Sequence, residues 1–411
     1  MVMMRLRLLL GLGQLQALAA LAVPLDGRSP APPPLTFRKD GTFQISVFND
    51  LHFGENAWDS WGPQQDINSV KVLNNVLDKE SPQLVVLNGD LITGENAFLA
   101  NGSVYVDQIL KPIDDRGLLF ASTYGNHDSD FNLSSVSMWE RENTHPNCRT
   151  GRMVQGRNAG ITNYYLPVYP FKCCREKCGP ELLLWFFDSR GGNYFQESNP
   201  DGSKVARPNW VDESVVDWFQ KTNAGLVSEH GRVIPSLAFV HIPPFVSKAI
   251  QTEHGESSIN PNTNPGINDD YDLASQAQGW CSDGSTNSSC SYGGQDVPFM
   301  HAIASTPGII GLFSGHDHGD TWCYKWDRLV PGTSVAGNGV NLCFGQHSGY
   351  GGYGNWIRGA RQIQVSRSTL RKSLEAESWI RLETGDIVGA VSLNSTFGKD
   401  MYPATPDDMT S

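Results

Sequence analysis

Five short apolar runs, each ending in side chains that can bind metal, constrain this chain more than any other feature. The runs precede Asp50-Leu51-His52, Gly89-Asp90, Gly125-Asn126-His127-Asp128, His241 and Gly315-His316-Asp317-His318. After the first motif, Ile67, Val70, Leu73 and Leu77 recur at the spacing of an amphipathic helix. Strands that alternate with helices predict a layered α/β protein with ligand groups at the strand ends. Since the motifs extend from residue 50 to residue 318, one domain must hold them all.

The expected strands end directly before these motifs. Strands are predicted at 43–48, 84–87, 118–123, 182–187, 237–240 and 309–313, with helices around 106–113 and 211–219. Beyond residue 320 the helical pattern fades, and short strands are expected at 321–326, 340–344, 362–365, 379–382 and 387–393. The stretch 252–297 is rich in Gly, Asn, Ser and Asp, which predicts a surface insertion.

The residues at those strand ends supply carboxylates, an amide oxygen and several imidazoles. Two divalent cations about 3.5–4 Å apart need such mixed oxygen and nitrogen ligands, with one anionic group shared between them. Side chains two positions apart on an extended segment can project to the same side, so Asp50 with His52, and His316 with His318, could each grip an ion. The pattern therefore predicts a two-metal site.

Each motif also has an ordinary structural explanation. A single D-x-H or G-H-x-H after a strand is most often a turn with a satisfied histidine, and Gly125-Asn126 could form a turn through positive φ. His241 alone, at the end of an apolar strand, would usually be a core histidine. Five such motifs in this order are much harder to explain by turns and packing, which favours the metal-site interpretation.

The N-terminal segment is typical of an exported protein. Arg5 and Arg7 precede an apolar run, and Ala20-Leu21-Ala22 offers a small-x-small cleavage site, so residues 1–22 are predicted to be a signal peptide. An N-terminal membrane anchor is the alternative, although the run is short for a span. No later segment resembles a membrane span, so none is expected in the mature protein. We expect a proline-rich connector at 23–42, the catalytic domain at 43–395 and a tail at 396–411.

Cysteines and glycosylation sequons agree with export. The chain has eight cysteines, an even number that oxidation could pair, and the best local pairs are Cys281–Cys290 and Cys323–Cys343. Zinc binding by the cysteines at 173, 174 and 178 is disfavoured, because their spacing lacks the paired C-x2-C form. Asn-x-Ser/Thr sequons occur at Asn101, Asn132, Asn287 and Asn394. Together these features predict a secreted, extracellular glycoprotein, with the vacuole or cell wall as alternative destinations.

Charge narrows the choice of partner. The 411 residues carry 31 Lys and Arg against 43 Asp and Glu, a formal net charge of −12. Such an acidic chain repels phosphate backbones, which disfavours a role as a nucleic-acid scaffold. A small phosphorylated substrate is compatible with this charge where a local group of cations reverses the field.

The ordered set of five motifs closely resembles the calcineurin-like metallophosphoesterase superfamily, whose pattern is D-x-H, G-D, G-N-H-D/E, H and G-H-x-H. The resemblance covers roughly residues 43–320 and implies a layered α/β fold of two stacked mixed β-sheets flanked by helices. It implies that Asp50, His52 and His318 hold one metal, that Asn126, His241 and His316 hold the other, and that Asp90 bridges them. His127 is then the histidine beside the substrate, with Asp128 orienting its ring.

A glycine-rich segment, residues 344–359, is similar to exported fungal members related to the small purple-acid-phosphatase-like proteins of plants. Purple acid phosphatases carry a tyrosine three residues after the bridging aspartate, and Thr93 stands at that position here. The iron–tyrosinate centre is therefore not supported, and the two divalent metal ions could be Mn, Zn or Fe. Arg190 could hold a substrate oxygen or be a surface arginine in a turn. His347, with Tyr350 and Tyr353, could line the entrance.

These features make a secreted dimetal-dependent phosphoesterase the leading hypothesis, with phosphomonoesters as substrates and a metal-bound hydroxide as the attacking group. His127 would protonate the departing oxygen or stabilise its negative charge. Two alternatives stay open. One is a phosphodiesterase that acts on nucleotides or lipid headgroups, and the other is a catalytically silent secreted binding protein. An intracellular regulatory phosphatase conflicts with the signal peptide and the sequons.

Overall fold

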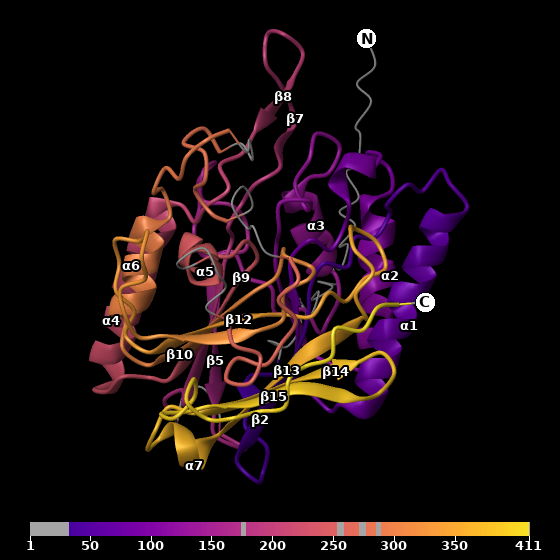
Figure 1. Ribbon diagram of the computed structural model, residues 1–411. Helices are drawn as coiled ribbons and strands as arrows, with labels where there is room; N and C mark the ends of the chain where they lie inside the picture. The colour runs from indigo at the N-terminus through magenta and orange to yellow at the C-terminus, as the bar shows by residue number, and fades with distance from the viewer. Residues whose placement is uncertain (1–32, 174–177, 253–258, 271–276, 285–288, 411) are drawn as a thin grey trace, which may run out of the picture. The chain divides into compact units, whose positions relative to one another are not determined.

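The computed structural model describes residues 33–173, 178–252, 259–270, 277–284 and 289–410 (Figure 1). The chain divides into residues 1–33 and residues 34–411, and apart from Pro33 every described residue belongs to the second unit. The predicted signal peptide, residues 1–22, lies outside the described residues, as do the first half of the predicted connector, residues 23–32, and the sequon residue Asn287.

The first sheet is built around parallel strands that are apolar on both faces. β2 (Thr42–Phe48), β3 (Leu84–Asn88) and β4 (Phe120–Thr123) are parallel neighbours. β13 (Gly359–Ser366) joins β2 in antiparallel pairing, and β14 (Ala376–Leu382) and β15 (Ile387–Leu393) extend the sheet. Within the described residues the six strands have the order β15-β14-β13-β2-β3-β4. Because parallel and antiparallel pairs coexist, this sheet is mixed.

The second sheet is also mixed and has a parallel centre. β6 (Leu182–Phe187), β9 (Ser236–Val240), β10 (Ile309–Ser314) and β12 (Val340–Phe344) pair in parallel. β5 (Tyr164–Tyr169) pairs with β6 in antiparallel orientation, and β11 (Cys323–Trp326) does so with β12. In the part of the chain that the structure describes, the seven strands have the order β1 (Leu35–Thr36), β5, β6, β9, β10, β12 and β11.

Alternation of side chains along the strands shows how the two sheets stack. In β6 the side chains of Leu182, Leu184 and Phe186 pack into one core cluster, whereas Leu183, Trp185 and Phe187 pack into another. The first of these clusters also takes in Ile45 and Val47 of β2, so it lies between the two sheets. The outer faces must then be covered by helices, because strands that are apolar on both faces are buried on both.

Helices cover both outer faces, as Figure 1 shows. α1 (Trp61–Lys79), α2 (Gly102–Asp114) and α3 (Ser135–Glu142) contribute to the core beside β2 to β4. α4 (Glu213–His230), α5 (Phe245–Gln251) and α6 (Val297–Ser305) pack on the other sheet. The remaining elements are short: η1 (Gly94–Asn96), α7 (Arg367–Leu370) and the hairpin of β7 (Asn193–Ser198) and β8 (Lys204–Ala206). The predicted fold class, two stacked mixed sheets flanked by helices, is confirmed.

The apolar runs predicted the strands well and the helical faces less well. Strands at 182–187, 340–344 and 387–393 have the predicted bounds, and the others differ by a few residues. In α1, however, Ile67 is 53% exposed, because the buried face is formed by Val72, Leu73, Val76 and Leu77. β5 was not predicted, and its sequence is interrupted by Pro167, which pairs with Leu183 near the edge of the sheet.

Both ends of the described chain contact the folded core. Leu35 in β1 and Phe37 are buried, although they fall within the predicted connector. At the other end, within the predicted tail, Met409 bridges to Trp356, and the amide of Ile357 donates to the carbonyl of Asp408. The tail therefore lies against the glycine-rich segment. No helix in the described part of the chain is both long and apolar enough to span a membrane.

Disulfides join the expected cysteine pairs. Cys323–Cys343 links the neighbouring strands β11 and β12, and Cys281–Cys290 closes part of the 252–297 insertion. Cys173 and Cys178 form a further disulfide. Cys174 lies outside the described residues, and within them Cys148 bonds to no other cysteine, so the expected pairing of all eight is not seen for Cys148.

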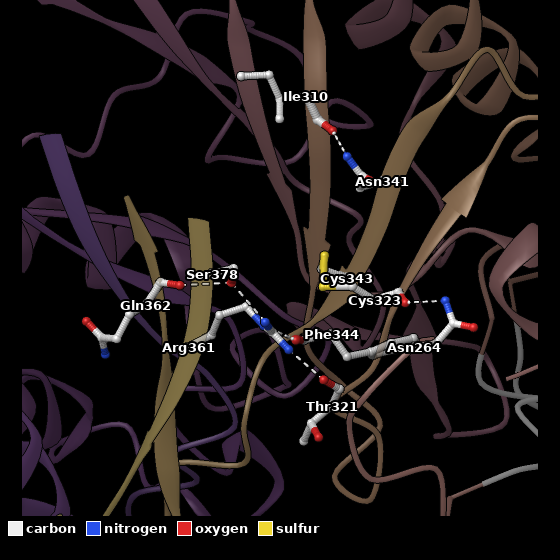
Figure 2. The surroundings of a disulfide bond; sticks show 10 residues. All are labelled: Asn264, Ile310, Thr321, Cys323, Asn341, Cys343, Phe344, Arg361, Gln362 and Ser378. Carbon is white, nitrogen blue, oxygen red and sulfur yellow. Dashed lines mark hydrogen bonds between the residues drawn. A yellow bond between two sulfur atoms is a disulfide. The ribbon is translucent and has the colours of Figure 1, made fainter. Parts of the chain in front are cut away.

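A buried arginine beside the Cys323–Cys343 disulfide ties the two sheets together (Figure 2). Arg361 projects from β13 and donates to the backbone carbonyls of Phe344, at 2.6 Å, and Thr321, at 2.5 Å. It also donates to Oγ of Ser378 at 2.9 Å. Phe344 is the last residue of β12. These hydrogen bonds therefore join the two sheets close to the strand ends that carry the predicted site residues.

The insertion is partly integrated into the core. Asn264 donates to the carbonyl of Cys323, and the amide of Ile267 donates to Oγ1 of Thr321. Gln278 is fully buried and donates to the carbonyl of Ile242, directly after the predicted ligand His241. This part of the insertion therefore supports the site, and the expectation of a surface segment is wrong for these residues.

Candidate metal centre

The predicted ligands follow strands of both sheets. Asp50, Asp90 and Asn126 follow β2, β3 and β4, and His241 and His316 follow β9 and β10. Hydrogen bonds between the two sheets hold these strand ends next to each other. Nδ2 of Asn88 lies 3.4 Å from the carbonyl of Val240 and 3.3 Å from that of Phe313, and the amide of His316 donates to the Asp50 carboxylate at 3.1 Å.

The backbone at these positions is unusual. Asp50, His52, Asp90 and His316 have φ of 55°, 48°, 50° and 78°, in the left-handed region that side chains with a Cβ seldom adopt. Such conformations cost about 1–3 kcal/mol each and persist where the surrounding structure enforces them, commonly at functional sites. The same φ values show that Asp50 and His52 converge through tight turns and not through the extended segment that was expected.

Within the described part of the chain, the acidic and histidine ligands form two groups. Asp50, His52 and His318 form the first, and Asp90, His241 and His316 form the second, with one ligand atom of each residue within 4.8 Å of the others in its group. The side chains of both groups are buried. His316 and His318 therefore belong to different groups and are not placed to bind the same ion.

Asp90 lies between the two groups. Its Oδ2 is 2.9 Å from Nε2 of His241 and 4.0 Å from Nδ1 of His316 in its own group. The same oxygen is 3.8 Å from Nε2 of His52 in the other group. The remaining oxygen, Oδ1, accepts a hydrogen bond of 2.8 Å from the amide of His127. A carboxylate in this position can be shared by two cations.

Neighbouring groups orient the histidine rings. Nδ1 of His241 lies 2.9 Å from the carbonyl of Asn88, and Nδ1 of His318 lies 2.7 Å from that of Tyr353. Nδ1 of His52 lies 3.2 Å from Oγ1 of Thr93, the residue that replaces the tyrosine of purple acid phosphatases. When one ring nitrogen is held in this way, the other is left free to bind a metal.

Several buried polar atoms at the centre have no protein partner. Among the described residues, Nε2 of His52, Nε2 of His316 and Oδ1 of Asn126 are buried and make no hydrogen bond. Leaving buried polar atoms unpaired costs free energy, so such atoms call for a ligand. Imidazole nitrogens with carboxylate and amide oxygens suit Mn, Zn and Fe, so the residues present fit a pair of divalent cations.

Burial and neighbouring charge set the protonation of the centre. Burial lowers the pKa of His52 and of His316 to about 3, which keeps both rings neutral. Burial also raises the pKa of Asp50 to about 6. Burial would raise the pKa of Asp90 too, but His241 and His127 hold it well below its ordinary value. Neutral imidazoles and an ionised central carboxylate are the forms that bind metal. Burial alone would lower the pKa of His241, but Asp90 raises it to about 9, so this ring must lose a proton when it binds metal.

The carboxylate that reaches the His127 ring comes from Glu95 and not from Asp128. Nδ1 of His127 lies 2.6 Å from Oε1 of Glu95, in η1. Burial alone would lower the pKa of His127, but Asp90 and Glu95 raise it to about 10, which favours the protonated ring. Asp128 instead accepts from the backbone amides of Leu91, Ile92 and Gly125, so it fixes the loop that carries His127.

Arg190 and His347 lie in different surroundings. Arg190 is buried, and its guanidinium donates to the carbonyls of Trp210 and Asn158 at 2.7 and 2.8 Å. Its Nη1 also lies 3.3 Å from Oδ2 of Asp212, so its donors are directed at these backbone carbonyls and at a carboxylate. His347 is buried and its ring packs 3.8 Å from that of His318, so it supports a predicted ligand. The sequon residues Asn101, Asn132 and Asn394 are half-buried.

The glycine-rich segment covers the first ligand group. Tyr353 stacks on His318 with ring centroids 4.0 Å apart, and a Cβ on Gly352 would lie 2.5 Å from Cε1 of His318. Gly352 also has a φ of 76°, in the left-handed region. Glycine fits both this backbone conformation and the lack of space for a Cβ without strain. Sequence reasoning noted Tyr353 but missed Glu95, Asn88 and Gly352. Gly352 is the fourth residue of the run G-Y-G-G-Y-G-N-W, residues 349–356, and this glycine-rich pattern was the available signal for it.

Two stacked mixed sheets therefore carry a pair of adjacent ligand groups at the ends of their strands, an arrangement suited to two metal ions. A family model for calcineurin-like phosphoesterases matches residues 43–320, which is more than half of the chain. The chain belongs to this family.

Similar proteins include two from Arabidopsis thaliana. "Probable inactive purple acid phosphatase 28" is 27% identical over 384 residues, covering 85% of this chain and 83% of that protein. "Probable inactive purple acid phosphatase 14" is 25% identical over 376 residues, covering 83% of this chain and 78% of that protein. Among solved structures, a dimetal phosphatase from Danio rerio is 12% identical, with a TM-score of 0.49, and the match covers 86% of this chain and 98% of that one.

Proposed function

We propose that this protein is a secreted, dimetal-dependent phosphoesterase that hydrolyses phosphomonoesters. The observation that carries the proposal is the position of Asp90 between two ligand groups whose buried imidazole and amide atoms have no partner among the described residues. Family membership supports the same chemistry. The disulfides and the predicted signal peptide support export.

In this proposal Asp50, His52 and His318 hold one metal, Asn126, His241 and His316 hold the other, and Asp90 bridges both. Two bound divalent cations would neutralise charge on a phosphoryl group and make hydroxide available near neutral pH. The hydrogen bonds of the three rings with the carbonyls of Asn88 and Tyr353 and with Oγ1 of Thr93 hold the histidines in place before substrate arrives.

His127 is the proposed proton donor to the leaving oxygen. Its side chain is 30% exposed, so it can reach a substrate, and its ring lies 4.9 Å from that of His52. The charges of Asp90 and Glu95 keep the imidazole protonated, which is the form a general acid needs. Glu95 acts through His127 and is a positioning residue, and Asp128 holds the loop.

A catalytically silent binding protein is the second candidate. The names of the similar plant proteins describe those proteins as probably inactive. In this chain every ligand position and His127 are occupied by the residue types that catalysis requires. A phosphodiesterase would use the same metal ligands, so activity on paired substrates must separate it from a monoesterase.

The test is a hydrolysis panel on full-length protein with Mn, Zn or Fe restored. Nitrophenyl phosphate and bis-nitrophenyl phosphate share a leaving group, so the ratio of their kcat/KM values separates monoesterase from diesterase. We expect two metal equivalents by elemental analysis and a preference for the monoester. Asp90→Asn should lose metal and activity, whereas the control Asp115→Asn, at an exposed ion pair with Lys111, should keep both.

Two results would overturn parts of this proposal. Fewer than two metal equivalents after reconstitution would remove the dimetal assignment. Two equivalents without hydrolysis of either ester would make the protein a silent metal-binding member of its family.

A further inference from the structure

A pocket lies beside the loop that carries His127, outside the two ligand groups. Its volume is about 260 Å³, and it is lined by three segments: residues 129–136, residues 152–161 and the strand β7, together with Arg207. Two hydrogen bonds join the lining of this pocket to the loop that carries His127. Oγ of Ser135 donates to the carbonyl of Asp128 at 3.1 Å, and the amide of Asn193 donates to the carbonyl of Ser129 at 2.9 Å.

Two arginines face this pocket without a carboxylate partner. Arg207 is only 6% exposed, and its guanidinium lies 3.5 Å from Oγ of Ser135 and 5.8 Å from the ring of Tyr194. Arg152 has a buried Nε with no hydrogen-bond partner. Among the described residues, neither guanidinium has a carboxylate within ion-pair distance. A buried cation without a counter-ion is costly, so these two side chains indicate an anionic ligand.

The acidic group in the pocket is already neutralised. Glu197 lines the pocket, but its carboxylate pairs with both terminal nitrogens of Arg157, one of them at 2.6 Å. The charges of Arg157 and Glu197 therefore cancel, and the net charge that the pocket presents comes from Arg152 and Arg207. Arg pairs well with phosphate because its planar N–H groups match two phosphate oxygens.

The N-terminus of α3 points into the same pocket. Ser134 is the N-cap and accepts from the amide of Ser137, and Ser135 and Val136 begin the helix. Ser134, Ser135 and Val136 all line the pocket. The amides of Ser135 and Val136 have no acceptor among the described residues. Free amides at a helix N-terminus, with the positive end of the helix dipole, bind anions such as phosphate.

We propose that this pocket binds a phosphate group, additional to the one expected at the metal centre. The ligand is either the second phosphate of a doubly phosphorylated substrate or free inorganic phosphate. The first source rests on the proposed function, whereas phosphate binding at the pocket does not. Ser129 lines the pocket and is two residues from His127, so the pocket adjoins the loop that carries the proposed proton donor.

Binding is tested by equilibrium dialysis of full-length, metal-loaded protein against radiolabelled inorganic phosphate. Arg152→Gln should hold one phosphate equivalent fewer than the wild type, and Arg207→Gln should do the same. Arg141→Gln is the matched control, because it removes one charge from α3 at an ion pair with Asp107 outside the pocket. It should bind as the wild type does. Arg152 is half-buried, so its replacement disturbs folding less than that of the buried Arg207. If Arg207→Gln does not fold, Arg152→Gln alone still tests the proposal.

The two sources are separated by kinetics on butyl phosphate and 1,4-butanediyl bisphosphate. If the pocket holds a substrate phosphate, Arg152→Gln lowers the ratio of bisphosphate to monophosphate kcat/KM about 10-fold, whereas Arg141→Gln does not. An unchanged ratio with lost phosphate binding assigns the pocket to free phosphate. Equal phosphate stoichiometry and affinity in the wild type and Arg152→Gln would overturn the proposal. If the protein proves inactive, a loss of bound phosphate in Arg152→Gln still supports the pocket, so the two failures are distinguishable.

Discussion

Oε1 of Glu95 lies 2.6 Å from Nδ1 of His127, so the exposed histidine of the metal centre is held by a carboxylate from a different loop. Glu95 is in η1, five residues beyond Asp90, and η1 is anchored to the histidine loop by the hydrogen bond from the amide of Gly94 to the carbonyl of His127. Because Nδ1 of His127 contacts Glu95, Nε2 is the ring nitrogen that remains for the proposed proton transfer to a substrate.

Replacing Glu95 by Gln tests this positioning role. Without the carboxylate, the protonated ring of His127 loses a favourable neighbour, so kcat should fall about 10-fold while both metals remain bound. The decisive readout is a double-mutant cycle with His127→Asn, measured as kcat/KM on butyl phosphate. If Glu95 acts only through His127, adding Glu95→Gln to His127→Asn costs nothing further. Additive losses would contradict the positioning role.

Replacing His127 by Asn should separate leaving groups. General acid catalysis contributes about 10²–10⁴-fold, and an alkyl alcohol leaves as a strongly basic alkoxide that needs the proton. Nitrophenolate leaves readily without one. His127→Asn should therefore reduce kcat/KM for butyl phosphate far more than for nitrophenyl phosphate, at unchanged metal content. Equal losses on both esters, with metals retained, would exclude the acid role and leave electrostatic stabilisation or positioning.

The strands and the ligand residues could be predicted because their signals are local. Leu84 to Leu87 is apolar on both faces and stops at Gly89-Asp90, and a buried parallel strand with a ligand at its carboxyl end has that pattern. β5 escaped prediction because Pro167 interrupts its pattern. The exposed Ile67 in α1 was misplaced because several apolar stripes fit that sequence equally well.

The groups that tune the site could not be read from the sequence. The contact of Glu95 with His127 joins residues 32 positions apart, and the Tyr353 carbonyl that orients His318 lies 35 positions away. Such contacts form only when loops that are distant in the sequence come together in the folded chain. No local sequence pattern predicts them. Arg190 was left open between a substrate contact and a surface arginine in a turn, and it is instead buried, with its donors directed at backbone carbonyls and at the Asp212 carboxylate.

A buried carboxyl away from the metals should make stability depend on pH. Burial raises the pKa of Glu142 to about 7 from its ordinary 4.5, although Thr150 donates to it at 2.7 Å. Because the folded state holds this proton more tightly, the stabilising contribution is complete below about pH 4.5 and is lost as pH rises through about 7. The difference corresponds to roughly 3 kcal/mol.

Urea unfolding at pH 5 and pH 8 measures this effect. In Glu142→Gln no proton is exchanged at this position, so the fall in the free energy of unfolding between the two pH values should be smaller than in the wild type. Glu140→Gln, an exposed neighbour in the same helix, is the control and should follow the wild type. An equal pH dependence in Glu142→Gln would show that this carboxyl does not have the raised pKa.

Gly352 provides the sharpest test of how the glycine-rich segment supports the metal centre. A Cβ at this position would lie 2.5 Å from Cε1 of His318 and 2.8 Å from Cδ2 of His52, and the residue has a φ of 76°. Gly352→Ala must therefore displace two proposed ligands of the same metal. Gly332 is the matched control, because its φ is 86° and a Cβ there would meet nothing within 4 Å. Both alanine variants carry the left-handed backbone strain of about 1–2 kcal/mol, so both should lose a similar amount of stability from that source. Only Gly352→Ala should also bind metal about 10- to 100-fold more weakly, as happens when ligand orientation is disturbed. Metal retention is measured by titration with a competing chelator, alongside Tm. Equal retention by the two variants would mean that the segment covers His318 and His52 without fixing their positions.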